Sequence, residues 1–488
     1  MFERSSGVLL HPTSFPGPYG TGDLGEAAYR FIDFLVEAGQ HLWQVLPLGP
    51  PGYAGSPYDT RSSFAGSSQL IALDPLIEMG LLGPDDVRWT PATGDEAAGA
   101  KERLLRKAFD RLDHHAGILD GFDRFRDQEA YWLSDYALYR VLSDAHQGMP
   151  WYAWDEDLIQ RKPEALEAAR RRFSSEIRFQ SFLQYLFARQ WGNLKRYAHD
   201  RGVRIIGDIP IFVAHDSADV WAHQGVFILD AYGQPLLVAG VPPDLFSKTG
   251  QRWGNPCYRW DVMRESGYRW WIDRFRRTLE LTDIVRVDHF RGFAAGWQIP
   301  ADQPDAVHGQ WVLGPGLDFF ERVAAELGRL PIIVEDLGLI TDDVIALREQ
   351  LGYPGMKVLQ FAFGDDHRNP YLPHNYERDA VVYTGTHDND TTLGWFRSCS
   401  PWERDHVLRY LGSNGDEIHW DLIRLAFASV AVLAIVPLQD VLGLGSEARM
   451  NVPARMAGNW RWRYGVGDLT PGLAHRLADL TRLYGRGS

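Results

Sequence analysis

A charged pair interrupts an otherwise apolar segment of the chain. In "TDIVRVDHFRGF", residues 282–293, the charged residues Arg286 and Asp288 lie two positions apart. On a strand they would share one face, while Val285 and Val287 would occupy the other. Burying two ions costs several kcal/mol per ion unless their geometry is excellent. A strand that buries such a pair is therefore a candidate for a functional site.

Carboxylates and a histidine also end other apolar runs of the chain. These residues are Asp208, Glu335, Asp336, His387 and Asp388. Several like charges that converge in one place cost energy without a functional return. Each residue also has a structural interpretation: Asp336 could cap the helix that follows it, and His387 could be a buried imidazole with satisfied hydrogen bonds.

Several carboxylates, one arginine and many aromatic side chains, without a phosphate-binding loop, indicate chemistry on glycosidic bonds. A retaining mechanism uses an ionised nucleophile and a protonated general acid/base, with the two carboxyls about 5 to 5.5 Å apart. We expect Arg286 to lower the pKa of Asp288 and keep it ionised, while Glu335 stays protonated. The alternative is that Arg286 and Asp288 form a purely structural ion pair.

The elements that must position these residues are short apolar strands alternating with helices of period near 3.6. The eight predicted strands lie within residues 7–15, 41–49, 203–213, 283–290, 330–338, 356–364, 380–388 and 431–440. This alternation predicts an α/β fold with a parallel sheet, and eight such strands favour a (β/α)8 TIM barrel over an open sheet. In barrels of this type, active sites lie at the carboxyl ends of the strands.

Two connections are much longer than a crossover requires, so the single catalytic barrel of residues 1–488 is predicted to carry insertions. Residues 68–175 are predicted to form an inserted, mainly helical subdomain. Residues 214–262 are rich in Gly, Pro and aromatic residues and lack clear periodicity. We expect this second insertion to be a substrate-binding lid region.

The composition narrows the possible partners. A net charge of -14 argues against nucleic acids and anionic membranes, which need a basic surface. No apolar run reaches the length of a membrane span, and the first residues lack a signal-peptide pattern. The two cysteines, Cys257 and Cys399, form neither a CxxC pair nor a metal-binding spacing. We therefore expect a cytoplasmic protein.

Ordered motifs along nearly the whole chain resemble those of one known family. They include "GVLLHPTSFPGPYGTGDLG", "SPYDTRSSFAG", "GDIPIFVAHDSADVW", "TGQRWGNPCYRW", "RVDHFRGF", "VEDLG", "GMKVLQFAF", "THDNDTTLGW", "GSEARMN" and "GNWRWR". The sequence resembles the 4-alpha-glucanotransferases, also called amylomaltases or disproportionating enzymes, of the alpha-amylase superfamily. The resemblance implies a retaining enzyme that transfers 1,4-alpha-glucan segments to the 4-hydroxyl of glucose or of another glucan.

The resemblance also assigns roles to individual residues. It implies that Asp288 is the nucleophile, Glu335 the general acid/base, and Asp388 the carboxylate that stabilises the transition state. The residues that it implies for substrate binding are Tyr53, Tyr58, Asp208, Trp253, Gly254, Asn255, Arg286, His289, His387 and Asn459. For Trp253 the alternative is a tryptophan that packs its loop onto the barrel.

The expected partners are maltooligosaccharides, amylose and glycogen-derived glucans, and no metal or organic cofactor is expected, because two carboxyls supply both nucleophile and proton. The nearest alternative is an alpha-1,4-glucan hydrolase with the same three carboxylates. A second is a metal-dependent barrel hydrolase that uses His215, His289, His387 and nearby Asp residues. A third is a non-catalytic glucan-binding protein, which would be expected to have lost one of the three carboxylates.

Overall fold

The computed structural model describes residues 2–87, 94–244, 247–453, 455 and 457–487 of the 488-residue chain. Residues 88–93 of the predicted helical insertion and residues 245–246 of the predicted lid lie outside the described residues.

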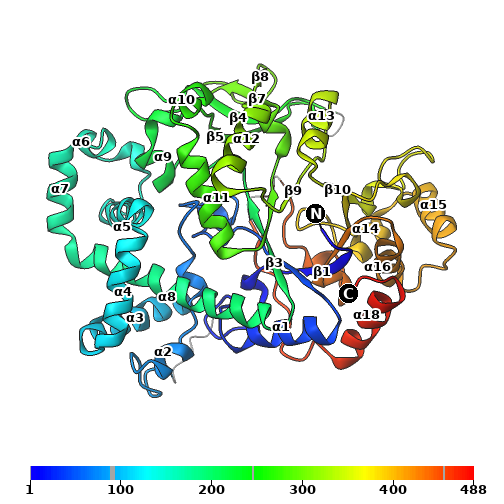
Figure 1. The fold of residues 1–488 in the computed structure, drawn as a ribbon, viewed down its shortest axis with the longest axis horizontal. Helices are drawn as coiled ribbons and strands as arrows, with labels where there is room; N and C mark the ends of the chain where they lie inside the picture. Colours follow the sequence, from blue (N-terminus) through cyan, green and yellow to red (C-terminus); the bar gives the residue numbers. More distant parts are fainter. Residues whose placement is uncertain (1, 88–93, 245–246, 454, 456, 488) are drawn as a thin grey trace.

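Eight parallel strands close into a barrel at the centre of the molecule (Figure 1). Around the barrel the order is β1-β12-β11-β10-β9-β6-β3-β2, and β2 pairs with β1 to close it. The strands are β1 (Ser5–Leu9), β2 (Leu42–Gln44), β3 (Arg204–Ile209), β6 (Ile284–Val287), β9 (Ile332–Val334), β10 (Gly355–Val358), β11 (Ala380–Tyr383) and β12 (Leu433–Pro437). Each lies within or overlaps one of the eight predicted runs, so the predicted barrel is confirmed.

Side chains alternate between the barrel interior and the helical shell. Ile284 belongs to the interior cluster, together with Ile206 of β3 and Ile333 of β9. Val285 and Val287 pack outside, against the surrounding helices. The alternation predicted for β6 is confirmed, and it turns Arg286 toward the interior because that residue shares the face of Ile284.

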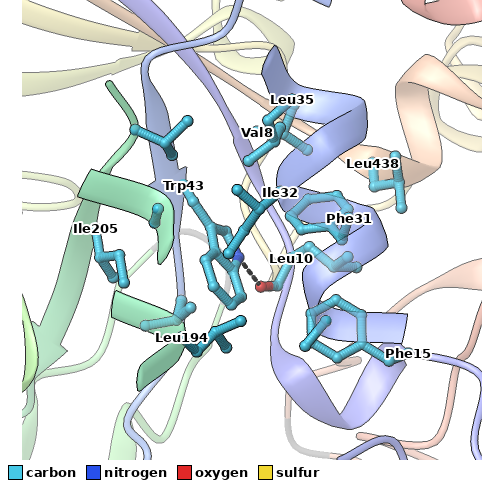
Figure 2. Close-up of a cluster of buried hydrophobic side chains, with 14 of the residues drawn as sticks. Val8, Leu10, Phe15, Phe31, Ile32, Leu35, Trp43, Leu194, Ile205 and Leu438 are labelled. Atoms are coloured by element: carbon cyan, nitrogen blue, oxygen red, sulfur yellow. Dashed lines mark hydrogen bonds between the residues drawn. The ribbon is translucent and has the colours of Figure 1, made fainter. Parts of the chain in front are cut away.

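The shell on one side of the barrel is built by two helices, α1 (Glu26–Glu37) and α8 (Ser174–His199). Figure 2 shows Phe31 and Ile32 of α1 packing around Trp43 of β2. The indole Nε1 of Trp43 donates a hydrogen bond to the carbonyl oxygen of Leu10 at 2.8 Å. A bulky aromatic residue is therefore accommodated in the core because its one polar group has a partner.

The remaining helices divide among the crossovers and the insertion. Helices α2 (Asp74–Glu78), α3 (Gly94–Asp110), α4 (Ala116–Gln128), α5 (Ala130–Ala145), α6 (Glu156–Ile159) and α7 (Pro163–Arg172) precede α8. The others are α9 (Ala218–Ala222), α10 (Trp260–Glu265), α11 (Arg269–Leu281), α12 (Gly316–Leu327), α13 (Asp342–Leu351), α14 (Thr392–Ser398), α15 (Pro401–Leu411), α16 (Ile418–Ala428), α17 (Leu438–Val441) and α18 (Pro471–Leu483). Among the helices that the structure describes, none is long and apolar enough to cross a membrane.

A second, antiparallel sheet follows the order β5-β4-β7-β8 and lies at the top of Figure 1. Its strands are β4 (Leu237–Val241), β5 (Gln251–Pro256), β7 (Ala295–Pro300) and β8 (Gln310–Leu313). The sequence predicted only a lid without periodicity at residues 214–262, and it missed this sheet. The reason is physical: β7 and β8 come from residues 295–313, after β6, and the outer strands β5 and β8 are mostly exposed, so they carry no apolar pattern.

The carboxyl-terminal residues fasten the end of the barrel where β1 begins. The guanidinium of Arg486 is fully buried and donates hydrogen bonds to the carbonyl oxygens of Phe427 at 2.8 Å, Ser5 at 3.1 Å and Ala431 at 3.0 Å. Gly487 also forms an isolated bridge with Ser5. Arg486 therefore connects β1, the end of α16 and the segment that enters β12.

We expect Arg486→Met to destabilise the protein by about 3 kcal/mol, because the apolar replacement leaves several buried carbonyl oxygens without donors. Thermal unfolding should show a fall in Tm of several degrees. Arg482→Met is the matched control, since the side chain of Arg482 on α18 is largely exposed. Equal melting temperatures for the two variants would contradict a fastening role for Arg486.

Candidate active site

One buried guanidinium organises the carboxyl ends of β3, β6 and β9. Nη1 of Arg286 lies 2.5 Å from Oδ2 of Asp208 and 3.0 Å from Oδ1 of Asp288. Nη2 of the same side chain lies 3.0 Å from Oε2 of Glu335. Burial alone would lower the pKa of Arg286, but Asp208 and Glu335 outweigh it and raise the pKa well above its ordinary value. Arg286 is thus a permanent cation that faces three carboxyl groups.

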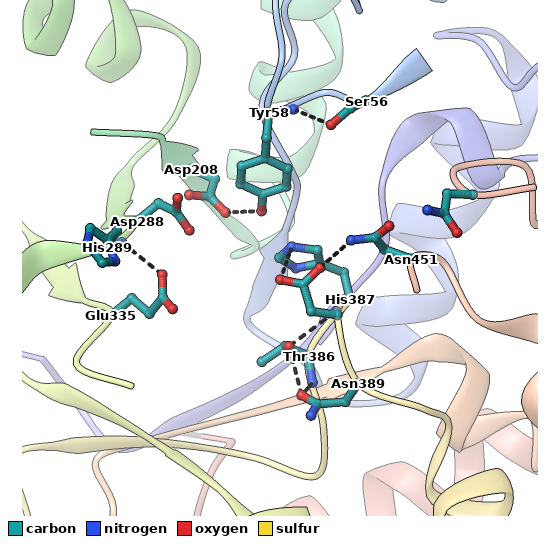
Figure 3. Close-up of polar contacts among 12 residues, drawn as sticks. Ser56, Tyr58, Asp208, Asp288, His289, Glu335, Thr386, His387, Asn389 and Asn451 are labelled. Atoms are coloured by element: carbon teal, nitrogen blue, oxygen red, sulfur yellow. Dashed lines mark hydrogen bonds and ion pairs between the residues drawn. The ribbon is translucent and has the colours of Figure 1, made fainter. Parts of the chain in front are cut away.

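Asp208 is the most enclosed of these carboxyls. The phenol of Tyr58 donates a hydrogen bond to its Oδ2 at 2.7 Å (Figure 3). Its other oxygen, Oδ1, is buried without a hydrogen-bond partner among the described residues. Burial raises the pKa of Asp208, and Arg286 and the Tyr58 hydrogen bond oppose that rise. Burial likewise raises the pKa of Tyr58, which keeps the phenol neutral and able to donate.

Asp288 and Glu335 lie together on one side of the site (Figure 3). Glu335 accepts a hydrogen bond from the backbone N–H of His289 at 2.8 Å. His289 has φ 48° and ψ 51°, a left-handed conformation that is uncommon outside glycine. The left-handed turn directly after Asp288 points the His289 N–H at Glu335. The chain thus holds His289 in a costly backbone conformation that places this donor.

The two carboxyls differ in the donors around them, and each affects the pKa of the other. Burial raises the pKa of Asp288 well above its usual value, and the neighbouring Glu335 carboxylate raises it further. Burial acts in the same direction on Glu335, but Arg286, a hydrogen bond with Asp288 and the His289 amide outweigh it and lower its pKa to about 2. Arg286 therefore contacts both carboxyls and does not select Asp288 alone, and Glu335 also accepts the His289 N–H; because the two groups titrate as one pair, an ionised Asp288 beside a protonated Glu335 stays a prediction.

The third carboxylate, Asp388, lies across the site from Asp288 and Glu335 and next to His387. Asp388 accepts a hydrogen bond from Nδ2 of Asn451 at 2.6 Å, and its Oδ2 lies 3.4 Å from Nε2 of His387. Its side chain is 48% exposed, so it can reach a ligand in the open mouth. The ring of His387 stacks on Tyr58 with centroids 4.9 Å apart and planes 12° apart.

A loop after β12 carries Trp460, which lies beside Tyr58 and His387. The ring of Trp460 lies 6.0 Å from both Tyr58 and His387. Asn459 does not point at the carboxylates; its amide holds the loop by hydrogen bonds with Val452 N, Val452 O and Arg455 O. Asn459 therefore acts on the site by placing Trp460, which has φ 63°.

Among the predicted lid residues, Trp253 presents an exposed ring and Asn255 anchors its strand. Trp253 on β5 is 38% exposed and meets the ring of His289 edge-on at 4.8 Å. Asn255 donates a hydrogen bond to the carbonyl oxygen of Val213 at 2.8 Å, which ties β5 to the segment after β3. Gly254 has φ 87°, a conformation that L side chains rarely adopt.

Three residues singled out from the sequence lie apart from this cluster. Tyr53 is exposed in the loop that precedes Tyr58, and its amide donates to Asp59. Asp336 is held by Arg348 and by the Met356 amide, each at 2.7 Å, as a structural carboxylate would be. His215 stacks on a tyrosine and lies 2.7 Å from the Gly233 carbonyl oxygen.

The metal-dependent alternative needs His215 to join His289 and His387, and the described contacts do not bring them together. In the part of the chain that the structure describes, no group of three or more histidine, cysteine or acidic residues could hold a metal ion.

Sequence reasoning missed Asn451 and Trp460 as individual residues of the site. Both lie in motifs quoted above, but on a loop without periodicity, so only their proximity to Asp388 and Tyr58 reveals a role. Phe212, whose ring lies 6.3 Å from Trp253, was missed for the same reason.

The closed barrel with an arginine, two adjacent carboxyls and a third opposite them defines an enzyme class, the (β/α)8 enzymes that act on glycosidic bonds. Comparison with known proteins narrows this class. The family described as 4-alpha-glucanotransferase matches residues 10–468. The chain belongs to the 4-alpha-glucanotransferase family.

Individual relatives agree with this membership. The chain is 52% identical to a 4-alpha-glucanotransferase of Thermus thermophilus over 97% of both chains, and 49% identical to one of Synechocystis over 99% of this chain and 98% of the relative. The solved structure of amylomaltase from Streptococcus agalactiae in complex with acarbose superimposes with a TM-score of 0.96 at 38% identity and full coverage of both chains. The family resemblance is confirmed, and the hydrolase alternative is not favoured.

We expect Arg286→Ala to move the acidic limb of the kcat/KM profile to higher pH by about one unit or more. Arg286 favours the ionised carboxyls, so its loss raises their pKa values and lets them protonate at higher pH. The profile is measured with maltotriose or, if activity is low, with an activated fluoride donor. Arg348→Ala is the control, because it removes an ion pair with Asp336 outside the reactive pair. An unmoved limb in Arg286→Ala would make Arg286 purely structural.

Proposed function

We propose that the chain transfers 1,4-alpha-glucan segments by a retaining mechanism in which Asp288 is the nucleophile, Glu335 the general acid/base and Asp388 the carboxylate that stabilises the transition state. The contact of Arg286 with both Asp288 and Glu335 carries the assignment of the reactive pair. In the first step the glycosidic bond breaks, a carboxylate oxygen of Asp288 bonds to the anomeric carbon, and Glu335 gives its proton to the leaving oxygen. In the second step the acceptor hydroxyl attacks the anomeric carbon, the bond to Asp288 breaks, and Glu335 takes the proton of the hydroxyl.

This assignment requires Glu335 to hold the proton of the pair when the substrate is bound. Burial raises the pKa of Asp288, and Arg286 with the His289 N–H acts to lower that of Glu335, so the two carboxyls titrate as one pair. Arg286 contacts both carboxyls, so one guanidinium influences the proton on either of them. A glycosidic oxygen beside Glu335 accepts a hydrogen bond from its protonated form, and the positive anomeric carbon favours ionised Asp288.

The remaining groups supply binding surfaces for a sugar ring. Asp208 is fully buried and acts on this surface by holding Tyr58 and Arg286. Tyr58 and His387 offer stacked faces, and Trp253 offers an exposed ring beside His289. These surfaces suit maltooligosaccharides, amylose and glycogen-derived glucans, and nothing in this chemistry calls for a cofactor.

We propose that residues 68–175 act as a helical insertion in one catalytic barrel. The sheet that carries Trp253 acts as the lid, and it includes residues 295–313 besides the predicted 214–262. Residence in the cytoplasm fits the two cysteines, Cys257 and Cys399, which are both free and buried.

Incubation with pure maltotriose tests the transferase function. We expect free glucose and a ladder of longer maltooligosaccharides with little increase in total reducing ends, because each transfer conserves the number of glycosidic bonds. Asp288→Asn should abolish both products and fail to form a covalent adduct with a fluoride donor. A steady rise in reducing ends without longer products would instead show a hydrolase, and an adduct on Glu335 would reverse the two roles.

Trp253→Ala should lower the transfer rate and raise the ratio of hydrolysis to transfer several-fold. Water near 55 M outnumbers a millimolar sugar acceptor, so the enzyme must favour the sugar by binding and by shielding the intermediate. Trp311→Ala is the matched control, since Trp311 lies on the same sheet and is also 38% exposed, but it contacts Trp297 and Arg291. Glucose, reducing ends and Tm are measured together. A large fall in Tm with an unchanged ratio would mean that Trp253 only packs the sheet.

A further inference from the structure

The carboxylate of Asp388 is held by hydrogen bonds more than by packing. Its side chain is 48% exposed, and the residue lies in a turn after β11. Its Oδ1 accepts the hydrogen bond from Asn451 at 2.6 Å, and its Oδ2 lies 3.4 Å from Nε2 of His387 (Figure 3). An exposed side chain keeps one direction only where fixed partners offset the loss of rotamer freedom. The main chain that carries Asp388 and Asn451 therefore has to be fixed as well.

Arg449 holds the main chain of both residues. Its Nη2 donates a hydrogen bond to the carbonyl oxygen of Asp388 at 3.0 Å, and its Nε donates to the carbonyl oxygen of Asn451 at 3.2 Å. The backbone N–H of Asn451 donates in turn to the carbonyl oxygen of His387 at 3.1 Å. One guanidinium thus joins the turn after β11 to a segment that lies 61 residues further along the chain.

The third nitrogen of the guanidinium faces another acid. Nη1 of Arg449 lies 3.8 Å from Oδ2 of Asp390, and this oxygen also accepts a hydrogen bond from the hydroxyl of Ser446 at 2.8 Å. The side chains of Arg449 and Asp390 are only 21% and 19% exposed, so their ion pair is partly shielded from water. Because a guanidinium is planar, this ion pair also fixes the directions of the two donors that reach the carbonyl oxygens.

We propose that Arg449 is a positioning residue, which sets the direction of the Asp388 carboxylate through the main chain of Asp388 and Asn451. The inference rests on the proposed function, because it requires that Asp388 stabilises the transition state. That stabilisation depends on a fixed distance to the reacting sugar, and a misplacement of about 1 Å can cost on the order of 100-fold in rate. The alternative is that Arg449 only stabilises the loop.

Arg449→Met tests the positioning role. Methionine cannot donate to the two carbonyl oxygens, so we expect kcat on maltotriose to fall roughly 10- to 100-fold. KM should stay within about three-fold, because an interaction that matters only in the transition state lowers kcat and kcat/KM alike. Arg449→Lys should lower kcat by about ten-fold, since an ammonium group keeps the charge but does not match the planar fork. The lysine variant also serves if the methionine variant does not fold.

Arg404→Met is the matched control for a structural effect. The guanidinium of Arg404 on α15 also donates to two carbonyl oxygens, those of Phe396 at 3.3 Å and Arg397 at 3.0 Å, but in the last turn of α14. Its loss should lower Tm and leave kcat unchanged. A purely structural Arg449 would behave in the same way, with a lower Tm and the kcat of the parent protein.

A double-mutant cycle with Asp388→Ala shows whether Arg449 acts through Asp388. The four proteins are compared with an activated fluoride donor, so that weak variants remain measurable. Without the Asp388 carboxylate there is nothing left to direct. Arg449→Met should therefore cost less than about three-fold in the Asp388→Ala background, although it costs at least ten-fold in the parent protein.

The possible failures can be told apart. Absence of maltotriose transfer in the parent protein, or a parent-like kcat in Asp388→Ala, would contradict the proposed function, and the role of Arg449 would fall with it. A large loss in Asp388→Ala together with a parent-like kcat in both Arg449 variants would overturn only the role of Arg449. An equal loss from Arg449→Met with and without the Asp388 carboxylate would overturn it as well.

Discussion

The site depends on a single electrostatic constraint: one buried guanidinium faces three carboxyl groups at the mouth of the barrel. Arg286 cannot lose its proton, so the excess negative charge has to be relieved by protonation of a carboxyl or by hydrogen bonds. The phenol of Tyr58 and the His289 amide supply two of those bonds. One cation facing three carboxyls allows the pair Asp288 and Glu335 to hold a proton, which acid/base catalysis at this pair requires.

The surroundings hold this charge cluster in place and leave one side open. Asn459 fixes the loop that carries Trp460, and Asn255 ties β5 to the segment after β3. These anchors lie on loops and on the second sheet, while Asp208 and Arg286 lie on barrel strands and Asp288 and Glu335 directly follow β6 and β9. Rigid strands set the geometry of bond cleavage, and the attached sheet presents Trp253 to an incoming chain.

Much of the fold was predictable because its signal is local. The eight barrel strands are short apolar runs, and the alternation of Ile284 and Val285 follows from strand geometry alone. The second sheet was not predictable in this way. Strands β4 and β7 pair across more than 50 residues of sequence around β6, and the outer strands β5 and β8 are too exposed to carry an apolar pattern.

The sequence by itself determined the barrel, the identity of the charged residues at its rim and the family to which the chain belongs. Only the tertiary structure decided how the charges are shared. Arg286 meets Asp208 and Glu335 across 78 and 49 residues of sequence, and it does not pair exclusively with its neighbour Asp288. The pKa of a buried carboxyl depends on burial and on donors within a few ångströms, and these quantities do not exist until distant strands lie side by side.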